Sequence, residues 1–130
     1  MSLNDPLANV LSSVKNYEDL GKKELSVRNN SKLIRKVLSI MQDNKYLGAY
    51  EEIHDGKGGI LKINLLGNIN DTKVIKPRFS VKITDYDKFE KRYLLAKDFG
   101  IIIVSTHKGM MTHIEAKKQK LGGRLICYCY

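Results

Sequence analysis

The most constraining feature of the sequence is the apolar run GIIIV at residues 100–104. Its side chains are mainly β-branched, and such side chains favour strands. The run is far shorter than the ~20 residues that a membrane-spanning helix needs. Because neighbouring residues of a strand point to opposite faces, an unbroken apolar run predicts a strand that is buried on both sides. The rest of the chain must therefore supply elements that cover it.

Residues 1–70 are predicted to form an N-terminal α/β subdomain with the order α-β-α-β-β. Apolar residues recur at helical spacing after Asp5-Pro6 and again after Asn30-Ser31, and both pairs are typical of helix starts. A short alternating segment at residues 23–28 lies between the two helices. The segments AYEEIH and ILKINLL flank DGKGG at residues 55–59, which indicates a β-hairpin with a glycine-rich turn.

Residues 71–130 are predicted to form a second subdomain that is mostly β with one short helix. Residues 74–83 read as a single extended segment, and Pro77 keeps it away from a central position in a sheet. Residues 84–96 fit either a short helix or a loop. A T-x-x-E capping box predicts a helix at about 112–120, and alternating residues predict a terminal strand at 124–130. We therefore expect an α+β fold of two small packed subdomains, with a boundary near residues 70–78.

The charge of the chain points to an acidic partner. Lys and Arg number 23 against 14 Asp and Glu, which gives a formal net charge of +9. This excess is spread along the chain rather than gathered in a tail, as expected of a folded module with a basic face. The first residues lack the features of a secretory signal. We therefore expect an intracellular protein that binds nucleic acid more readily than a membrane.

Polar residues directly after the buried strand form the first candidate site. Residues 105–109 read STHKG and are expected to be a loop that leads to the capped helix. Hydroxyls, backbone N–H groups and a helix start suit phosphate and ribose oxygens, although an ordinary polar loop would have the same composition. Gly122-Gly123 would permit close approach of a partner backbone. Arg124 and nearby lysines add positive charge.

Catalytic and metal-binding sites are less well supported. Ser105 could act as a nucleophile with His107 as its base, but the serine does not lie in the G-x-S-x-G motif that is typical of such hydrolases. Cys127 and Cys129 with scattered histidines do not match the spacing of structural zinc sites, and two buried thiols explain them more simply. We expect no enzyme activity, no metal, no cofactor and no small-molecule substrate.

The motifs resemble a known family. V-S-T-x-K-G-x-M-T-x-x-E-A at 104–116 and L-G-G-x-L-x-x-Y at 121–128 resemble the C-terminal signature of the eighth protein family of the small ribosomal subunit. D-P-L-A-N at 5–9 and S-K-L-I at 31–34 are similar in order and spacing, and the resemblance covers nearly the whole chain. V-I-K-P-R-F at 74–79 is closer to the archaeal and eukaryotic branch than to the bacterial one.

The resemblance implies a structural protein of the cytoplasmic ribosome. Its partners would be an irregular stem in the central domain of small-subunit ribosomal RNA and neighbouring ribosomal proteins, and it would act early in assembly. Binding to its own messenger RNA, as a repressor, is a further expectation from the family. The shallow minor groove of RNA suits small hydroxyls and bare glycine backbone. The RNA-binding residues expected on this basis are Ser105, Thr106, His107, Lys108, Gly109, Gly122, Gly123, Arg124, Asn30, Ser31, Lys32 and Lys57.

Overall fold

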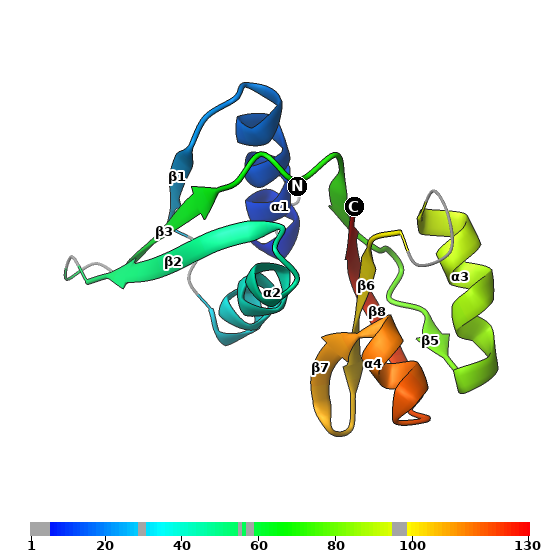
Figure 1. Cartoon of the computed structure of the whole chain (residues 1–130). Coiled ribbons are helices and arrows are strands. Elements are labelled where there is room, and N and C mark those ends of the chain that lie inside the picture. The colour runs from blue at the N-terminus through cyan, green and yellow to red at the C-terminus, as the bar shows by residue number, and fades with distance from the viewer. Residues whose placement is uncertain (1–5, 29–30, 55, 57–58, 95–98) are drawn as a thin grey trace. The chain divides into compact units, whose positions relative to one another are not determined.

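The computed structural model describes residues 6–28, 31–54, 56, 59–94 and 99–130. The chain divides into two compact units, residues 1–72 and 73–130, which we call unit 1 and unit 2 (Figure 1). Each unit has its own sheet, and the fold is of the expected α+β class.

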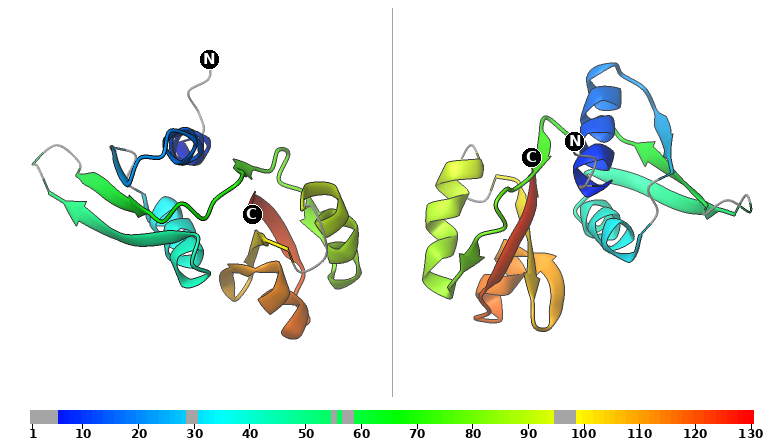
Figure 2. Two further views of the ribbon diagram at one scale, coloured as in Figure 1. Left: turned by 45° about the horizontal axis from the view of Figure 1, so that its top comes forward. Right: turned by 180° about the vertical axis from the view of Figure 1, so that it is seen from behind.

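Unit 1 has the predicted order α1 (Pro6–Asp19), β1 (Glu24–Val27), α2 (Lys32–Asp43), β2 (Leu47–Ile53) and β3 (Ile60–Leu65). Its strands form an antiparallel sheet in the order β1-β3-β2. Leu61, Ile63 and Leu65 alternate along β3 with more exposed residues, so one face of the sheet is apolar. The two helices lie on this face and bury the apolar stripes that the sequence shows (Figure 2). The hairpin predicted at 49–66 is confirmed.

A carboxylate closes unit 1 from the end of its first helix. The two carboxylate oxygens of Glu18, near the end of α1, accept hydrogen bonds from the backbone N–H groups of Gly67 at 3.2 Å and Ile69 at 3.0 Å. Those two residues lie in the connection that follows β3. A charged acceptor that holds two backbone donors is a stronger tie than a neutral hydrogen bond. These two hydrogen bonds thus hold the end of α1 against the segment that follows β3.

Strand β4 (Thr72–Val74) begins at the last residue of unit 1 and joins the sheet of unit 2. The other elements of unit 2 are β5 (Ser80–Val81), a 3-10 turn η1 (Ile83–Asp85), α3 (Tyr86–Tyr93), β6 (Ile101–Thr106), β7 (Gly109–Thr112), α4 (His113–Lys118) and β8 (Gly123–Cys129). The sheet order is β4-β8-β6-β7, and β5 also pairs with β8. The segment predicted to be extended at 74–83 is not one continuous strand: it holds only the end of β4 and the two residues of β5, with a cis Lys76-Pro77 bond between them. Residues 86–93 settle the ambiguous segment as a helix. Ile101 to Val104 are buried, as the apolar run predicted.

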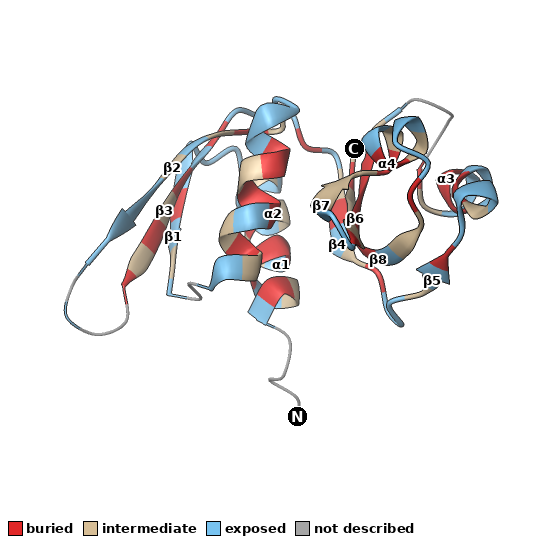
Figure 3. Cartoon of the chain, turned by 90° about the horizontal axis from the view of Figure 1, so that it is seen from below, coloured by how far each residue is buried: buried red, intermediate tan, exposed pale blue. Residues whose placement is uncertain are grey.

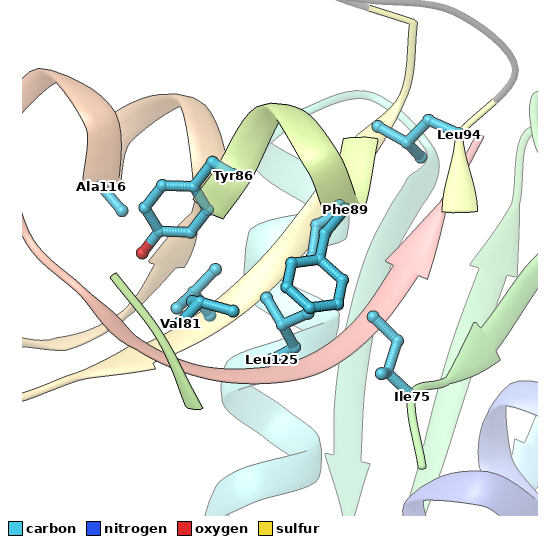
Figure 4. Packing of buried hydrophobic residues seen from close by; sticks show 9 residues of the cluster. Ile75, Val81, Tyr86, Phe89, Leu94, Ala116 and Leu125 are labelled. Atoms are coloured by element: carbon cyan, nitrogen blue, oxygen red, sulfur yellow. The ribbon is translucent and has the colours of Figure 1, made fainter. Parts of the chain in front are cut away.

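One face of this sheet carries the core of unit 2. Val104 on β6 and Leu125 on β8 belong to an apolar cluster that α3 and α4 cover. Figure 4 shows Tyr86 and Phe89 of α3 pointing toward the strands, with Leu125 nearby. Tyr86 is fully buried, and its hydroxyl donates a hydrogen bond to the Leu121 carbonyl at 2.8 Å, so the ring's one polar atom is satisfied. Burial raises the pKa of this hydroxyl above its ordinary value.

Candidate nucleic-acid interface

The segment expected to be a loop, residues 105–109, is the turn of a β-hairpin. Ser105 and Thr106 end β6, Gly109 begins β7, and only His107 and Lys108 lie between the strands. Strand β7 therefore separates this turn from helix α4, contrary to the expectation that the loop leads directly to a helix start. Thr112 does cap α4, since its hydroxyl accepts from the Glu115 backbone N–H at 3.2 Å. The helix start nevertheless does not adjoin the turn.

The hydroxyl of Thr106 shapes the turn. It donates to the Gly109 carbonyl at 2.8 Å and accepts from the Lys108 backbone N–H at 3.1 Å. Thr106 is buried, whereas His107, Lys108 and Gly109 are exposed. This geometry favours a positioning role for Thr106 and leaves the tip residues to meet a partner.

Gly109 is required by backbone conformation. Its φ is +111°, a region that residues with a Cβ rarely adopt. A Cβ built there would meet no atom within 4 Å, so no neighbouring group demands glycine at this position. The tip of the hairpin is therefore open on this side, and a partner can approach the backbone closely.

Strand pairing aligns three polar side chains in a row. Ser80 on β5 is opposite Arg124 on β8, and Arg124 is in turn opposite Ser105 on β6. Side chains of directly paired residues lie on the same face of a sheet. Val81, Leu125 and Val104, the next residues along the three strands, belong to the apolar cluster under α3 and α4. Ser80, Arg124 and Ser105 therefore lie on the opposite face, and we call them the polar row.

Ser80 was missed by the sequence analysis. It is exposed and lies far from residues 105–124 in the sequence, and only the pairing of β5 with β8 brings it beside Arg124. The alternation of Phe79, Ser80 and Val81 is compatible with a strand but does not reveal its partner. Nothing in the local sequence could have identified it.

Gly122 and Gly123 lie directly against backbone carbonyl groups of neighbouring strands in unit 2. A Cβ on Gly123 would be 2.3 Å from the Ser105 carbonyl oxygen, and one on Gly122 would be 2.6 Å from the Val81 carbonyl oxygen. Both distances are far below a normal contact. The fold of unit 2 thus requires glycine at both positions, whether or not a partner also uses the bare backbone.

In unit 1, two of the four expected residues can be described. Ser31 caps α2, and its hydroxyl accepts from the Ile34 backbone N–H at 3.2 Å. Lys32 is exposed in the first turn of the same helix. Asn30 and Lys57 lie outside the described residues.

A family model for ribosomal protein S8 matches residues 5–130, which is nearly the whole chain. The chain belongs to this family. It is therefore a protein of the small ribosomal subunit that binds ribosomal RNA and assembles with other ribosomal proteins. The family consists of structural ribosomal proteins and not of enzymes, which weighs against a hydrolase built on Ser105 and His107.

In this family member, a buried polar network supports the hairpin from the side of the helices. His113 is fully buried, and its Nδ1 accepts a hydrogen bond from the Ile102 backbone N–H at 3.1 Å. An accepting Nδ1 places the proton of the neutral ring on Nε2, which lies 3.3 Å from Glu90 Oε1. Glu90 also pairs with Lys117.

The network extends to the surface through Lys117. Its Nζ lies 3.2 Å from the Asp87 carboxylate as well as beside Glu90. Burial lowers the pKa of Lys117, but its interactions with Glu90 and Asp87 outweigh burial, so the pKa lies above the ordinary value. The buried carboxylate of Glu90 on α3 thus has a polar and a charged partner on α4, His113 and Lys117, and His113 in turn holds the backbone of β6.

The two cysteines, Cys127 and Cys129, are buried free thiols on β8. Burial raises the pKa of Cys127 far above its ordinary value, which keeps this thiol protonated. Among the described residues, no three His, Cys, Asp or Glu side chains lie close enough to hold a metal ion. In the same part of the chain, no helix is long and apolar enough to cross a membrane.

Proposed function

We propose that the polar row and the tip of the β6–β7 hairpin bind an irregular stem in the central domain of small-subunit ribosomal RNA. The observation that carries the proposal is the register that places Ser105 beside Arg124, next to a tip whose residues His107, Lys108 and Gly109 are exposed. The Ser105 hydroxyl and the open backbone of Gly109 suit the shallow minor groove of RNA. The cations of Lys108 and Arg124 suit the phosphates beside that groove.

Each residue has a distinct role in this proposal. Ser105 and the backbone of Gly109 approach ribose hydroxyls, and Lys108 and Arg124 contact phosphates. His107 lies at the tip and makes a polar contact. Thr106 holds the turn, while Gly122 and Gly123 let β8 pass close to its neighbouring strands. Unit 1 is proposed to add contacts to the RNA backbone through Asn30, Ser31, Lys32 and Lys57.

The experiment is a salt series of binding to a transcript of the stem. Ser105→Ala should weaken binding by about 1 kcal/mol, the typical net value of one hydrogen bond, with little change in salt dependence. Lys108→Gln should reduce the slope of log affinity against log salt by about 0.7 to 0.9. The matched control is Ser26→Ala, which removes an exposed hydroxyl from β1 of the other unit.

A regular duplex of equal length serves as the second RNA. Because shape rather than base identity carries specificity in this proposal, the irregular stem should bind more tightly. Equal binding of both RNAs would contradict the proposal, as would an equal effect of Ser26→Ala and Ser105→Ala.

We also propose that the same surface binds a stem of similar shape in the protein's own messenger RNA and represses translation during early assembly of cytoplasmic ribosomes. A translation assay with that message should show repression by the wild type and weaker repression by Ser105→Ala. Unchanged translation on addition of the wild-type protein would rule out this role.

A further inference from the structure

Helix α3 of unit 2 separates its charges. Its two carboxylates, Asp87 and Glu90, both pair with Lys117 of α4. Glu90 is only 2% exposed and also lies beside His113. Both carboxylates of α3 therefore already share a cationic partner within the unit.

The basic residues of α3 are arranged differently. Lys88, Lys91 and Arg92 are all exposed, and α3 is largely pale blue on its outer side in Figure 3. Positions i, i+3 and i+4 lie on one face of a helix. Within the described part of the chain, no carboxylate lies within ion-pair distance of any of the three. We call these three residues the α3 cation face.

Aromatic rings fix two of these cations in place. The guanidinium of Arg92 lies 5.2 Å from the ring centre of Phe79 and 5.4 Å from that of Tyr93. The ammonium of Lys88 lies 5.3 Å from the ring centre of Phe89. A cation held against a ring loses less side-chain freedom when it binds an anion, so such a surface is preorganised.

The rings beneath the cations form a continuous series. Successive ring centres are 5.5 Å apart from Phe79 to Phe89, 6.3 Å to Tyr93, 5.6 Å to Tyr128 and 6.0 Å to Tyr130. Most of these rings stack on one another, and Phe79, Phe89 and Tyr93 also contact Lys88 or Arg92. Because their faces are occupied in this way, the surface presents positive charge more than open rings for unstacked bases.

We propose that the α3 cation face is a second RNA-binding surface, which contacts the phosphate backbone rather than bases. The inference rests on the proposed function, because the RNA is the one that the polar row binds. Neighbouring positions on a helix face bring the three cations within about 5–6 Å of one another at their Cβ atoms, so they can meet successive phosphates of one strand. An acidic protein segment would have charge of the same sign, but the family to which the chain belongs binds ribosomal RNA, so RNA is the occupant that we propose.

The position of α3 gives this surface a separate role. Within unit 2, α3 lies beside β5, on the side away from the β6–β7 hairpin, in every view of Figures 1 and 2. RNA that contacts the α3 cation face as well as the tip of the hairpin must therefore span unit 2 from α3 to β7.

The test compares two double variants in the salt series with the irregular stem. Lys88→Gln/Lys91→Gln should reduce the slope of log affinity against log salt by about 1.4 to 1.8, as expected for two lost phosphate contacts. Lys22→Gln/Lys23→Gln removes the same charge from exposed lysines of unit 1 and should change the slope by less than half as much. Arg92→Lys keeps the charge but loses the planar stacking group, and should weaken binding about two- to five-fold.

The outcomes separate this inference from the proposed function. If the wild type does not bind the stem, the proposed function fails and this inference fails with it. If the wild type binds and the two double variants have equal slopes, only this inference is overturned. Polyglutamate represents the alternative, an acidic protein partner. If Lys88→Gln/Lys91→Gln no longer bound polyglutamate but kept the wild-type slope of log RNA affinity against log salt, the surface would be assigned to an acidic protein instead.

Discussion

Substitution of Gly123 by alanine tests whether this glycine serves the fold or the partner. The added Cβ would be 2.3 Å from the Ser105 carbonyl oxygen and 3.0 Å from both the Ser105 carbonyl carbon and Val104 Cγ1. Two strands would have to move apart to admit it. Such overpacking costs about 1–3 kcal/mol. Alanine also restricts the unfolded chain, which offsets about 0.4–1 kcal/mol. The free energy of unfolding should therefore fall by about 1–2 kcal/mol.

Urea unfolding of the protein without RNA, followed by circular dichroism, measures this change. For a urea slope of about 2 kcal/mol/M, the midpoint of unit 2 should fall by about 0.5–1 M. The control is Ser80→Ala, which changes the adjacent strand without adding an atom and should stay within about 0.5 kcal/mol of the wild type. A Gly123→Ala protein with the wild-type midpoint and weaker RNA binding would refute the reasoning, since the glycine would then be needed only by the partner.

Three other predictions concern stability and reactivity. His113→Ala leaves the Ile102 backbone N–H without its acceptor inside the core and should lower the free energy of unfolding by about 1–3 kcal/mol; a midpoint equal to that of the wild type would contradict this role. Glu18→Gln loses the charge and one of the two accepting oxygens, and should destabilise unit 1 by about 1–2 kcal/mol in the same urea assay, whereas an unchanged transition of unit 1 would show that this tie contributes nothing. Because burial raises the pKa of Cys127, this thiol should react with iodoacetamide at pH 8 only after urea unfolding, and rapid labelling of the native protein would be the opposite result.

The sequence predicted the local elements of unit 1 well, because each depends on signals within a few residues. Three features were predicted from such local signals: the apolar stripes of the helices, the Ser31 cap, and the hairpin whose strands flank residues 55–59. Gly48 shows the limit of such signals: glycine is common just after a helix, but this residue lies within β2, where the strand pairing has an irregular register. Residue type alone did not distinguish a helix end from a strand.

Unit 2 was harder to predict because its pairings are distant in the sequence. The two short strands on either side of Pro77 both pair with β8, and no local pattern indicates a partner some fifty residues away. The hairpin at 105–109 was taken for a loop because its second strand, Gly109–Thr112, is short and includes the helix cap. The aromatic series from Phe79 to Tyr130 also depends on these pairings, so the order of these residues in the sequence does not reveal it.

The place of β8 in its sheet has a consequence for synthesis of the protein. This strand pairs with β4, β5 and β6, all of which precede it in the chain and are therefore made before it. All elements of unit 1 leave the translating ribosome before β8 does. At about 5–20 residues per second, unit 1 can fold several seconds before the sheet of unit 2 can close. A nascent chain that stalls before Gly123 would thus carry a folded unit 1 and a β6 that can pair only with β7, with the edge that β8 covers and part of the apolar run exposed to aggregation.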